Sequence, residues 1–151
     1  MSYDRYCQLI RELCEVVELP DAETAIARNA IEVEGFEVLL GHYDNDPEAM
    51  YLNFTFGSVT SGRSLRVFRL MLEANLTLYA QDQAQLGLDA DTGLVLLIVR
   101  IPMTHDTDGV YLADTFNHYA EHGRYWRENI LVAEDEMFES LSHGDYAWLR
   151  V

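Results

Sequence analysis

The residues most suggestive of chemistry are two histidines in the last third of the chain. Residues 118–122 read His-Tyr-Ala-Glu-His, which matches the H-x-x-E-H spacing of inverted zinc peptidases. On a helix, His118 and His122 share a face and could ligate zinc. That mechanism also needs a third, normally acidic ligand well downstream, in a cleft walled by a large domain, whereas only 29 residues follow His122. The pattern at 118–122 therefore predicts that both histidines lie on the surface of an amphipathic helix. Adventitious metal binding and a small zinc-dependent hydrolase are the alternatives.

Two loops share part of a ligand-binding signature. Asp89–Gly93 begins like a calcium loop, but such a loop needs Gly at its sixth position and Glu at its twelfth, where this chain has Leu94 and Arg100. Gly57–Ser64 lacks the Lys that reaches nucleotide phosphates. No Ser or Cys lies in a recognisable nucleophile elbow. We therefore expect no catalytic residue, no metal site and no cofactor, in a protein that is not an enzyme.

The chain is strongly acidic, with 26 acidic and 10 basic residues and a formal net charge of −16. This charge repels phosphate backbones and anionic lipid, so we expect no nucleic-acid partner. So acidic a surface favours solubility, or it attracts a basic partner. No apolar run approaches the roughly 18 to 20 residues that span a bilayer, and the N-terminus lacks the features of a signal peptide. We expect a cytoplasmic protein without membrane insertion.

The length and the apolar content predict one domain. A chain of 151 residues with 49% apolar residues can bury a sizeable core, and residues 1–151 fit a single domain. Cys7 and Cys14 lie two helical turns apart, a rise of about 10.5 Å, which is too far for a mutual disulfide. Both thiols are expected to be reduced, in or near the core.

Hydrophobic periodicity divides the chain into helices and strands. Apolar spacings of three and four predict helices, and alternation of apolar and polar residues predicts strands. The helices are expected over Tyr3–Val17, Ser64–Ala80 and Gly109 to about Leu141, with Gly123 able to break the last, and the strands over 31–34, 36–42, 50–56, Gln85–Leu88 and Leu94–Ile101. Pro20 and Asp21–Thr24 are expected to end the first helix. The order indicates an α+β fold, an antiparallel β-sheet with helices packed on it.

Two of these elements carry more apolar surface than one subunit needs. The middle helix has one apolar stripe with Leu65, Phe68 and Leu72, and a second stripe that includes Val67 and Met71. One stripe can cover the sheet, and a partner subunit is expected to cover the other, unless the helix is central to a single core. The strand 94–99 lacks polar alternation, so it is buried on both faces or offers one face to a partner.

Three sequence segments, in this order, carry a resemblance to a known family: Glu34–Leu40 (EGFEVLL), Leu72–Leu76 (LEANL) and Gly87–Gly93 (GLDADTG). With these segments the chain resembles, along nearly its whole length, the Tir-chaperone (CesT-like) family of type III secretion chaperones. The resemblance implies a homodimer that binds the N-terminal, largely extended region of a secreted effector protein and keeps it soluble and secretion-competent. It implies no cofactor and no turnover.

In such chaperones the middle helix and the neighbouring strand build the dimer. The resemblance therefore assigns to the dimer interface Leu65, Phe68, Met71, Leu72, Asn75 and Tyr79. The alternative for Asn75 and Glu73 is that they fix helix packing or capping within one subunit.

A client that must remain threadable cannot fold, so its apolar side chains need a surrogate core on the chaperone. We expect client contacts on apolar residues of the first helix and the strands, namely Leu9, Leu13, Val38, Leu40, Leu52, Phe54, Leu96 and Ile98, with an edge strand free for β pairing. Alternation does not say which sheet face a partner covers, so each could instead belong to the core. The aromatic segment Asp145–Val151 could pack on the dimer, touch the client or cap the core. The alternative function is a chaperone-like regulatory or adaptor module that binds a non-secreted protein.

Overall fold

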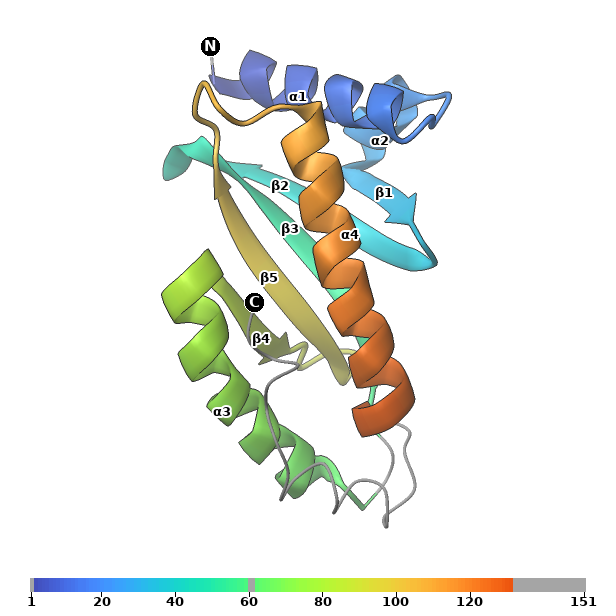
Figure 1. Ribbon diagram of the computed structural model, residues 1–151, viewed down its shortest axis with the longest axis vertical. Coiled ribbons are helices and arrows are strands. Elements are labelled where there is room, and N and C mark those ends of the chain that lie inside the picture. The colour runs from blue at the N-terminus through green and yellow to red at the C-terminus, as the bar shows by residue number, and fades with distance from the viewer. Residues whose placement is uncertain (1, 60–61, 132–151) are drawn as a thin grey trace.

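The computed structural model describes residues 2–59 and 62–131, with only the backbone of residues 79–82. Predictions for residues beyond 131, namely the end of the last helix near Leu141 and the segment Asp145–Val151, lie outside the described residues. The described chain is an antiparallel sheet with helices packed on one face and along one edge (Figure 1). This arrangement confirms the predicted α+β fold class.

Five strands form one sheet in the order β1-β2-β3-β5-β4. Their bounds are β1 Ala30–Val33, β2 Phe36–Tyr43, β3 Asp46–Ser58, β4 Ala84–Leu88 and β5 Leu94–Pro102. The turn between β1 and β2 is Glu34–Gly35, with φ of 51° and 83°, and two positive φ values are what the common two-residue hairpin turn requires. In Asp89–Gly93, the Gly93 N–H donates to the Asp89 carbonyl at 2.8 Å. Both predicted hairpins are therefore confirmed.

The helices surround the sheet unevenly. Their bounds are α1 Ser2–Val16, α2 Ala22–Arg28, α3 Ser64–Asp82 and α4 Gly109–Tyr125, followed by a π-helical segment, Trp126–Leu131. α1 and α4 pack on each other and on the same face of the sheet, whereas α3 runs along the outer edge at β4 (Figure 1). The opposite face of the sheet carries no described helix.

The core lies between α1, α4 and the inner face of the sheet. The aromatic rings of β3 meet those of α4 and the π-helical segment: Phe54 lies 5.5 Å from Phe116, and Phe56 lies 6.4 Å from Trp126, between ring centroids. Cys7 and Cys14 are free thiols buried on α1, as expected. Every second residue of β2, β3 and β5 points into this core, which fixes which side chains remain for a partner.

The short helix α2 was missed by sequence reasoning, which took Asp21–Thr24 only as the end of the first helix. In the structure, the Asp21 carboxylate accepts a hydrogen bond from the Thr24 N–H at 3.1 Å. This is an N-cap, and it starts a new helix instead of merely ending the previous one. An Asp followed by a short run of helix-forming residues was the available signal.

The expectation that Gly123 could break the last helix is wrong. α4 continues to Tyr125, and a Cβ on Gly123 would lie 2.9 Å from ring carbons of Phe36 and Phe56. Glycine is present because the helix backbone packs directly on two aromatic rings, and a helix tolerates it at modest cost in stability.

Candidate binding surfaces

α3 has one buried face and one exposed apolar face. The residues that face the subunit are Val67, Leu70, Met71, Ala74 and Leu78, all at most 6% exposed. The opposite face presents Leu65, Leu72 and Leu76, which are 84%, 71% and 80% exposed. We call these three residues the α3 stripe. Their exposure confirms that the two stripes of this helix have different environments and excludes a helix central to one core.

The structure places the residues predicted for the dimer interface in different environments. Leu65 and Leu72 belong to the α3 stripe, Phe68 is half-buried, and Met71 is buried within the subunit. The Asn75 side chain bonds within its own subunit, to the backbone of Leu86 in β4. The side chain of Tyr79 lies outside the described residues. Sequence reasoning missed Leu76, which its spacing of four from Leu72 and eleven from Leu65 could have indicated.

The outer face of the sheet is open and partly apolar. Leu39 on β2 is 43% exposed, and Leu96 and Ile98 on β5 are half-buried. The register joins them across the sheet, because Leu39 lies opposite Asn53 on β3, and Asn53 lies opposite Ile98. We call Leu39, Leu96 and Ile98 the open-face residues. Of the two alternatives for the strand 94–99, the structure shows the one in which a single face is buried.

The other six residues predicted for client contact belong to the core. They are Leu9, Leu13, Val38, Leu40, Leu52 and Phe54, each at most 5% exposed. On β2 and β3 these side chains point to the face that α1 and α4 cover, and the two α1 leucines point back at that face. They offer no surface to a partner in this structure. The alternation of apolar and polar residues distinguishes the two faces of the sheet. Only the position of α1 and α4 determines which of these faces is buried.

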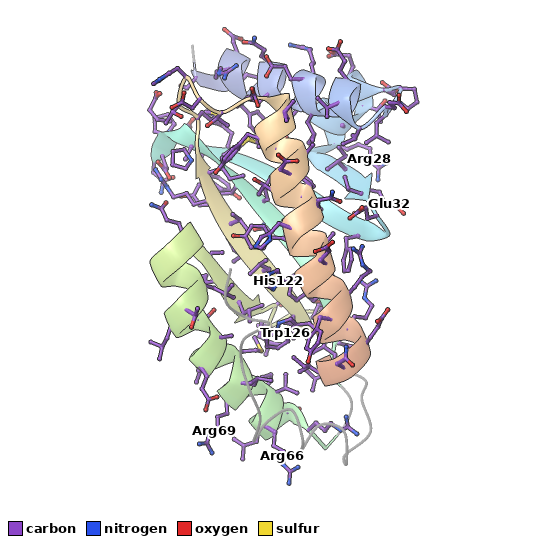
Figure 2. All side chains as sticks on the ribbon, viewed as in Figure 1. Arg28, Glu32, Arg66, Arg69, His122 and Trp126 are labelled. Carbon is purple, nitrogen blue, oxygen red and sulfur yellow. The ribbon has the colours of Figure 1, made fainter. Side chains whose placement is uncertain are left out.

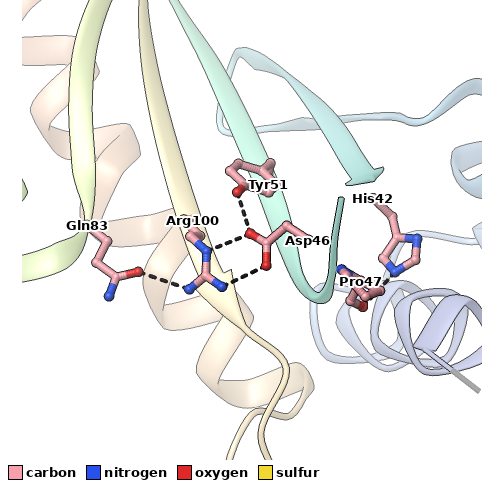
Figure 3. Close-up of polar contacts among 6 residues, drawn as sticks. All are labelled: His42, Asp46, Pro47, Tyr51, Gln83 and Arg100. Carbon is pink, nitrogen blue, oxygen red and sulfur yellow. Dashed lines mark hydrogen bonds and ion pairs between the residues drawn. The ribbon is translucent and has the colours of Figure 1, made fainter. Parts of the chain in front are cut away.

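A polar network closes one end of the open face (Figure 3). Arg100 on β5 binds Asp46 in a bidentate manner, from Nε to Oδ2 at 2.7 Å and from Nη2 to Oδ1 at 2.9 Å. Its Nη1 donates to Gln83 Oε1 at 3.2 Å, and the Tyr51 hydroxyl donates to Asp46 Oδ2. The Arg100 bonds, followed by the Tyr51 bond, lower the pKa of Asp46 to about 2. The network ties β3, β5 and the connection between α3 and β4 together, and sequence reasoning did not single it out.

The two histidines of the zinc-like motif lie on one face of α4. Their ring centroids are 4.7 Å apart, and His122 projects from α4 toward β5 (Figure 2). His118 lines a groove of about 490 Å³ between α4 and β5. Within residues 2–59 and 62–131, no group of three His, Cys, Asp or Glu side chains is placed to hold a metal ion.

Among the described residues, no helix is both long and apolar enough to cross a membrane.

The negative charge of the chain is also present at the strand β1. Two hollows flank this strand, one of about 400 Å³ that Val33 and Val17 help to line, and one of about 270 Å³ that Glu32 and Glu37 help to line.

Three solved structures have a similar fold. The ExsC–ExsE complex matches with a TM-score of 0.66 at 19% identity, over 87% of this chain and 97% of that chain. The HopA1–SchA chaperone–effector complex matches with a TM-score of 0.62 at 18% identity, over 82% and 93%. The heterodimeric ExoU–SpcU complex from the type III secretion system of Pseudomonas aeruginosa matches with a TM-score of 0.52 at 17% identity, over 85% and 98%. No curated protein matches the sequence significantly.

The family of this chain follows from its sequence. Residues 8–127 match the Tir chaperone protein (CesT) family, and this range contains α1 from Gln8 onward, α2, the whole sheet, α3 and α4. It also contains all three of the segments on which the sequence resemblance depends, at 34–40, 72–76 and 87–93. The chain therefore belongs to the Tir chaperone protein (CesT) family.

Proposed function

We propose that this protein is a cytoplasmic type III secretion chaperone that binds the N-terminal, extended region of an effector protein and keeps it soluble and competent for secretion. Membership of the CesT family supports this proposal, as does the fold shared with the SchA chaperone in its effector complex. The observation that carries it is the open sheet face, on which Leu39, Leu96 and Ile98 remain at least partly accessible and which no described helix covers (Figure 1).

The physical reason is that an effector kept unfolded exposes side chains that would otherwise fill its own core. Full burial of a Leu or Ile side chain is worth about 1.5 to 3 kcal/mol, so a few such contacts can hold an extended segment without any chemical step. Binding of this kind needs no catalytic residue. The function proposed here is therefore binding and release, without turnover.

We extend the proposal to a homodimer formed through the α3 stripe. Leu65, Leu72 and Leu76 are 71% to 84% exposed and lie on one side of a helix whose other side is buried. An apolar helix face meeting its own copy gives a closed, two-fold interface. Because Met71 is buried and Asn75 is bonded within the subunit, the proposed contact depends on the three leucines.

Co-expression with the proteins encoded beside its gene tests this function. We expect one neighbour to co-purify and to retain a protease-resistant N-terminal segment of roughly 50 to 100 residues, the span that an extended wrap needs. A doubly substituted protein, Leu96→Asp with Ile98→Asp, should lose the segment. The control Val110→Asp changes a 56% exposed residue of α4 and should retain it. Failure to capture any neighbour would contradict the proposal.

The alternative is a chaperone-like adaptor that binds a non-secreted protein. It is distinguished by removing the first roughly 100 residues of the captured partner, a length that covers an extended wrap. An effector chaperone should lose that truncated partner. An adaptor that recognises a folded domain should keep it.

A further inference from the structure

The strand β1 forms an open edge of the sheet. It pairs with β2 alone, so its other side has no neighbouring strand among the described residues. The two-residue turn Glu34–Gly35 makes Val33 and Phe36 a hydrogen-bonded pair, and the pairs then alternate along the hairpin. The Leu40 N–H donates to the Asn29 carbonyl at 2.8 Å, in the same alternation. The backbone groups of Ala30 and Glu32 therefore point away from β2 and can pair with a further strand.

Two hollows of different chemistry lie on the two sides of this edge. The first, of about 400 Å³, lies between the end of α1, β1 and α4 and includes the apolar side chains Val17, Leu19 and Val33. The second, of about 270 Å³, is lined by Arg28, Ala30, Ile31, Glu32 and Glu37. Glu32 lines both, so β1 separates them. Successive side chains of an added strand point to opposite faces, so they would enter the two hollows in turn.

The second hollow contains an uncompensated pair of like charges. Glu32 on β1 lies directly opposite Glu37 on β2, and both side chains are exposed. They form a non-hydrogen-bonded pair, in which side chains are closest, and facing like charges destabilise a sheet. Arg28 shares the hollow at the end of α2 (Figure 2), but it forms no ion pair within 4.0 Å with either glutamate.

The neighbouring acidic groups differ in how far they are neutralised. Glu34, at the turn, is 3.5 Å from the Arg124 guanidinium. Asp114, on the rim of the apolar hollow, is exposed and forms no ion pair with any described Lys or Arg. The carboxylates at this edge that no ion pair with a described residue neutralises are therefore Glu32 and Glu37, with Asp114 on the opposite side, and Arg28 contributes the positive charge of the second hollow.

We infer that β1 receives an extended strand in which apolar residues alternate with lysine or arginine. The apolar side chains enter the hollow between α1, β1 and α4, and the cation of the next residue binds between Glu32 and Glu37. The inference rests on the proposed function, because the strand is part of the bound client segment. It goes further by stating which residue pattern this protein selects.

Synthetic peptides of nine residues test the pattern without knowledge of the client. The three fluorescently labelled probes alternate valine with arginine, with serine or with glutamate, and binding is measured by fluorescence anisotropy. We expect the valine–arginine probe to bind about tenfold more tightly than the valine–serine probe, since two carboxylates face one cation. The valine–glutamate probe should not bind. At about 0.5 M salt, where screening acts over a few ångströms, the advantage of arginine should shrink to a small factor.

Charge-reversed proteins show where the probe binds. Glu32→Lys with Glu37→Lys should invert the preference, so that the glutamate probe binds and the arginine probe does not. The matched control, Glu48→Lys with Glu128→Lys, changes net charge equally at two exposed residues that line neither hollow and should keep the preference. The single variant Glu37→Lys should weaken arginine binding while raising the melting temperature, because Lys at 37 then pairs with Glu32.

Equal binding of the arginine and serine probes, or loss of preference in the control as large as in the reversed protein, would overturn the inference. Failure of this inference can be distinguished from failure of the proposed chaperone function. If Glu32→Lys with Glu37→Lys still captures a neighbour's N-terminal segment in normal yield, the chaperone function stands and the selection of basic residues at β1 does not.

Discussion

The side-chain amide of Asn75 binds both backbone groups of Leu86. Asn75 Oδ1 accepts from the Leu86 N–H at 2.6 Å, and Asn75 Nδ2 donates to the Leu86 carbonyl at 3.1 Å. Leu86 lies on β4, the last strand of the sheet, so these are groups that β5 does not use. One side chain therefore holds α3 beside the sheet and occupies the outward-facing backbone groups at the middle of this edge, whereas the β1 edge has no such partner among the described residues.

Replacement of Asn75 by Ala should destabilise the protein. The change removes two hydrogen bonds and leaves a partly buried backbone N–H and C=O without partners, which costs about 1 to 3 kcal/mol. Urea denaturation at a fixed protein concentration measures the loss. Gln85→Ala, an exposed change on the same strand, is the control and should leave the unfolding free energy nearly unchanged. Equal effects of both substitutions would contradict the role of Asn75.

The α3 stripe makes a separate prediction about oligomeric state. Leu72→Glu places a charge on a residue that is 71% exposed in the single subunit, so it should not disturb the fold. If two copies meet through this helix, the charge is buried in the interface and the dimer dissociates. Light scattering should then give half the mass of the unmodified protein. Val110→Glu, on α4, should leave the mass unchanged, and a dimer that survives Leu72→Glu would refute the proposed interface.

The close contact at Gly123 predicts that even one methyl group is harmful there. A Cβ would lie 2.9 Å from the rings of Phe36 and Phe56, so Gly123→Ala must shift packed aromatic side chains. The strain should exceed the gain of about 1 kcal/mol that alanine brings to a helix, with a net loss of about 1 kcal/mol. Thermal unfolding followed by circular dichroism measures it. Gly87→Ala, whose Cβ would meet no atom within 4 Å, should cost less than Gly123→Ala.

The ion pair of Asp46 and Arg100 predicts a pH dependence of stability. The pKa of Asp46 is about 2 in the folded protein, against an ordinary value of 3.8. Between these two pH values, Asp46 therefore binds fewer protons in the folded protein than in the unfolded chain. The stabilisation is therefore complete above about pH 4 and is lost as the pH falls toward about 2. In Asp46→Asn this part of the acid dependence should be missing, and stability at pH 6 should be lower. Chemical denaturation from pH 6 to pH 2 checks both.

Asp44→Asn is the control for this measurement, because Asp44 is exposed in the neighbouring turn. It should leave the acid dependence intact. A profile for Asp46→Asn that overlays the unmodified protein would show that the network does not contribute to the acid response.

The sequence predicted much of the secondary structure because local signals set it. The hairpin at Glu34–Gly35 and the turn Asp89–Gly93 follow from residues that adopt positive φ or form local hydrogen bonds. The two apolar stripes of α3 followed from spacing along one helix. The helix α2 was missed because its signal, an Asp N-cap, is short and overlaps the end of the preceding helix.

The binding surfaces were predicted less completely, because they depend on contacts between distant segments. A period of two assigns Val38 and Ile98 to one or the other sheet face, but only the packing of α1 and α4 buries the first and leaves the second half-exposed. Asn75 is similar: the family resemblance assigned it to the dimer interface, while its partner Leu86 became visible only in three dimensions.

The sequence by itself determined the family, the fold class and the excess of apolar and acidic surface, since these follow from composition, periodicity and short local segments. The tertiary structure determined which of these apolar and acidic side chains remain accessible. Glu32 and Glu37 are five residues apart in sequence, and the strand register makes them face each other at an open edge. The physical reason is that exposure and charge proximity are properties of packed elements, which no local pattern specifies.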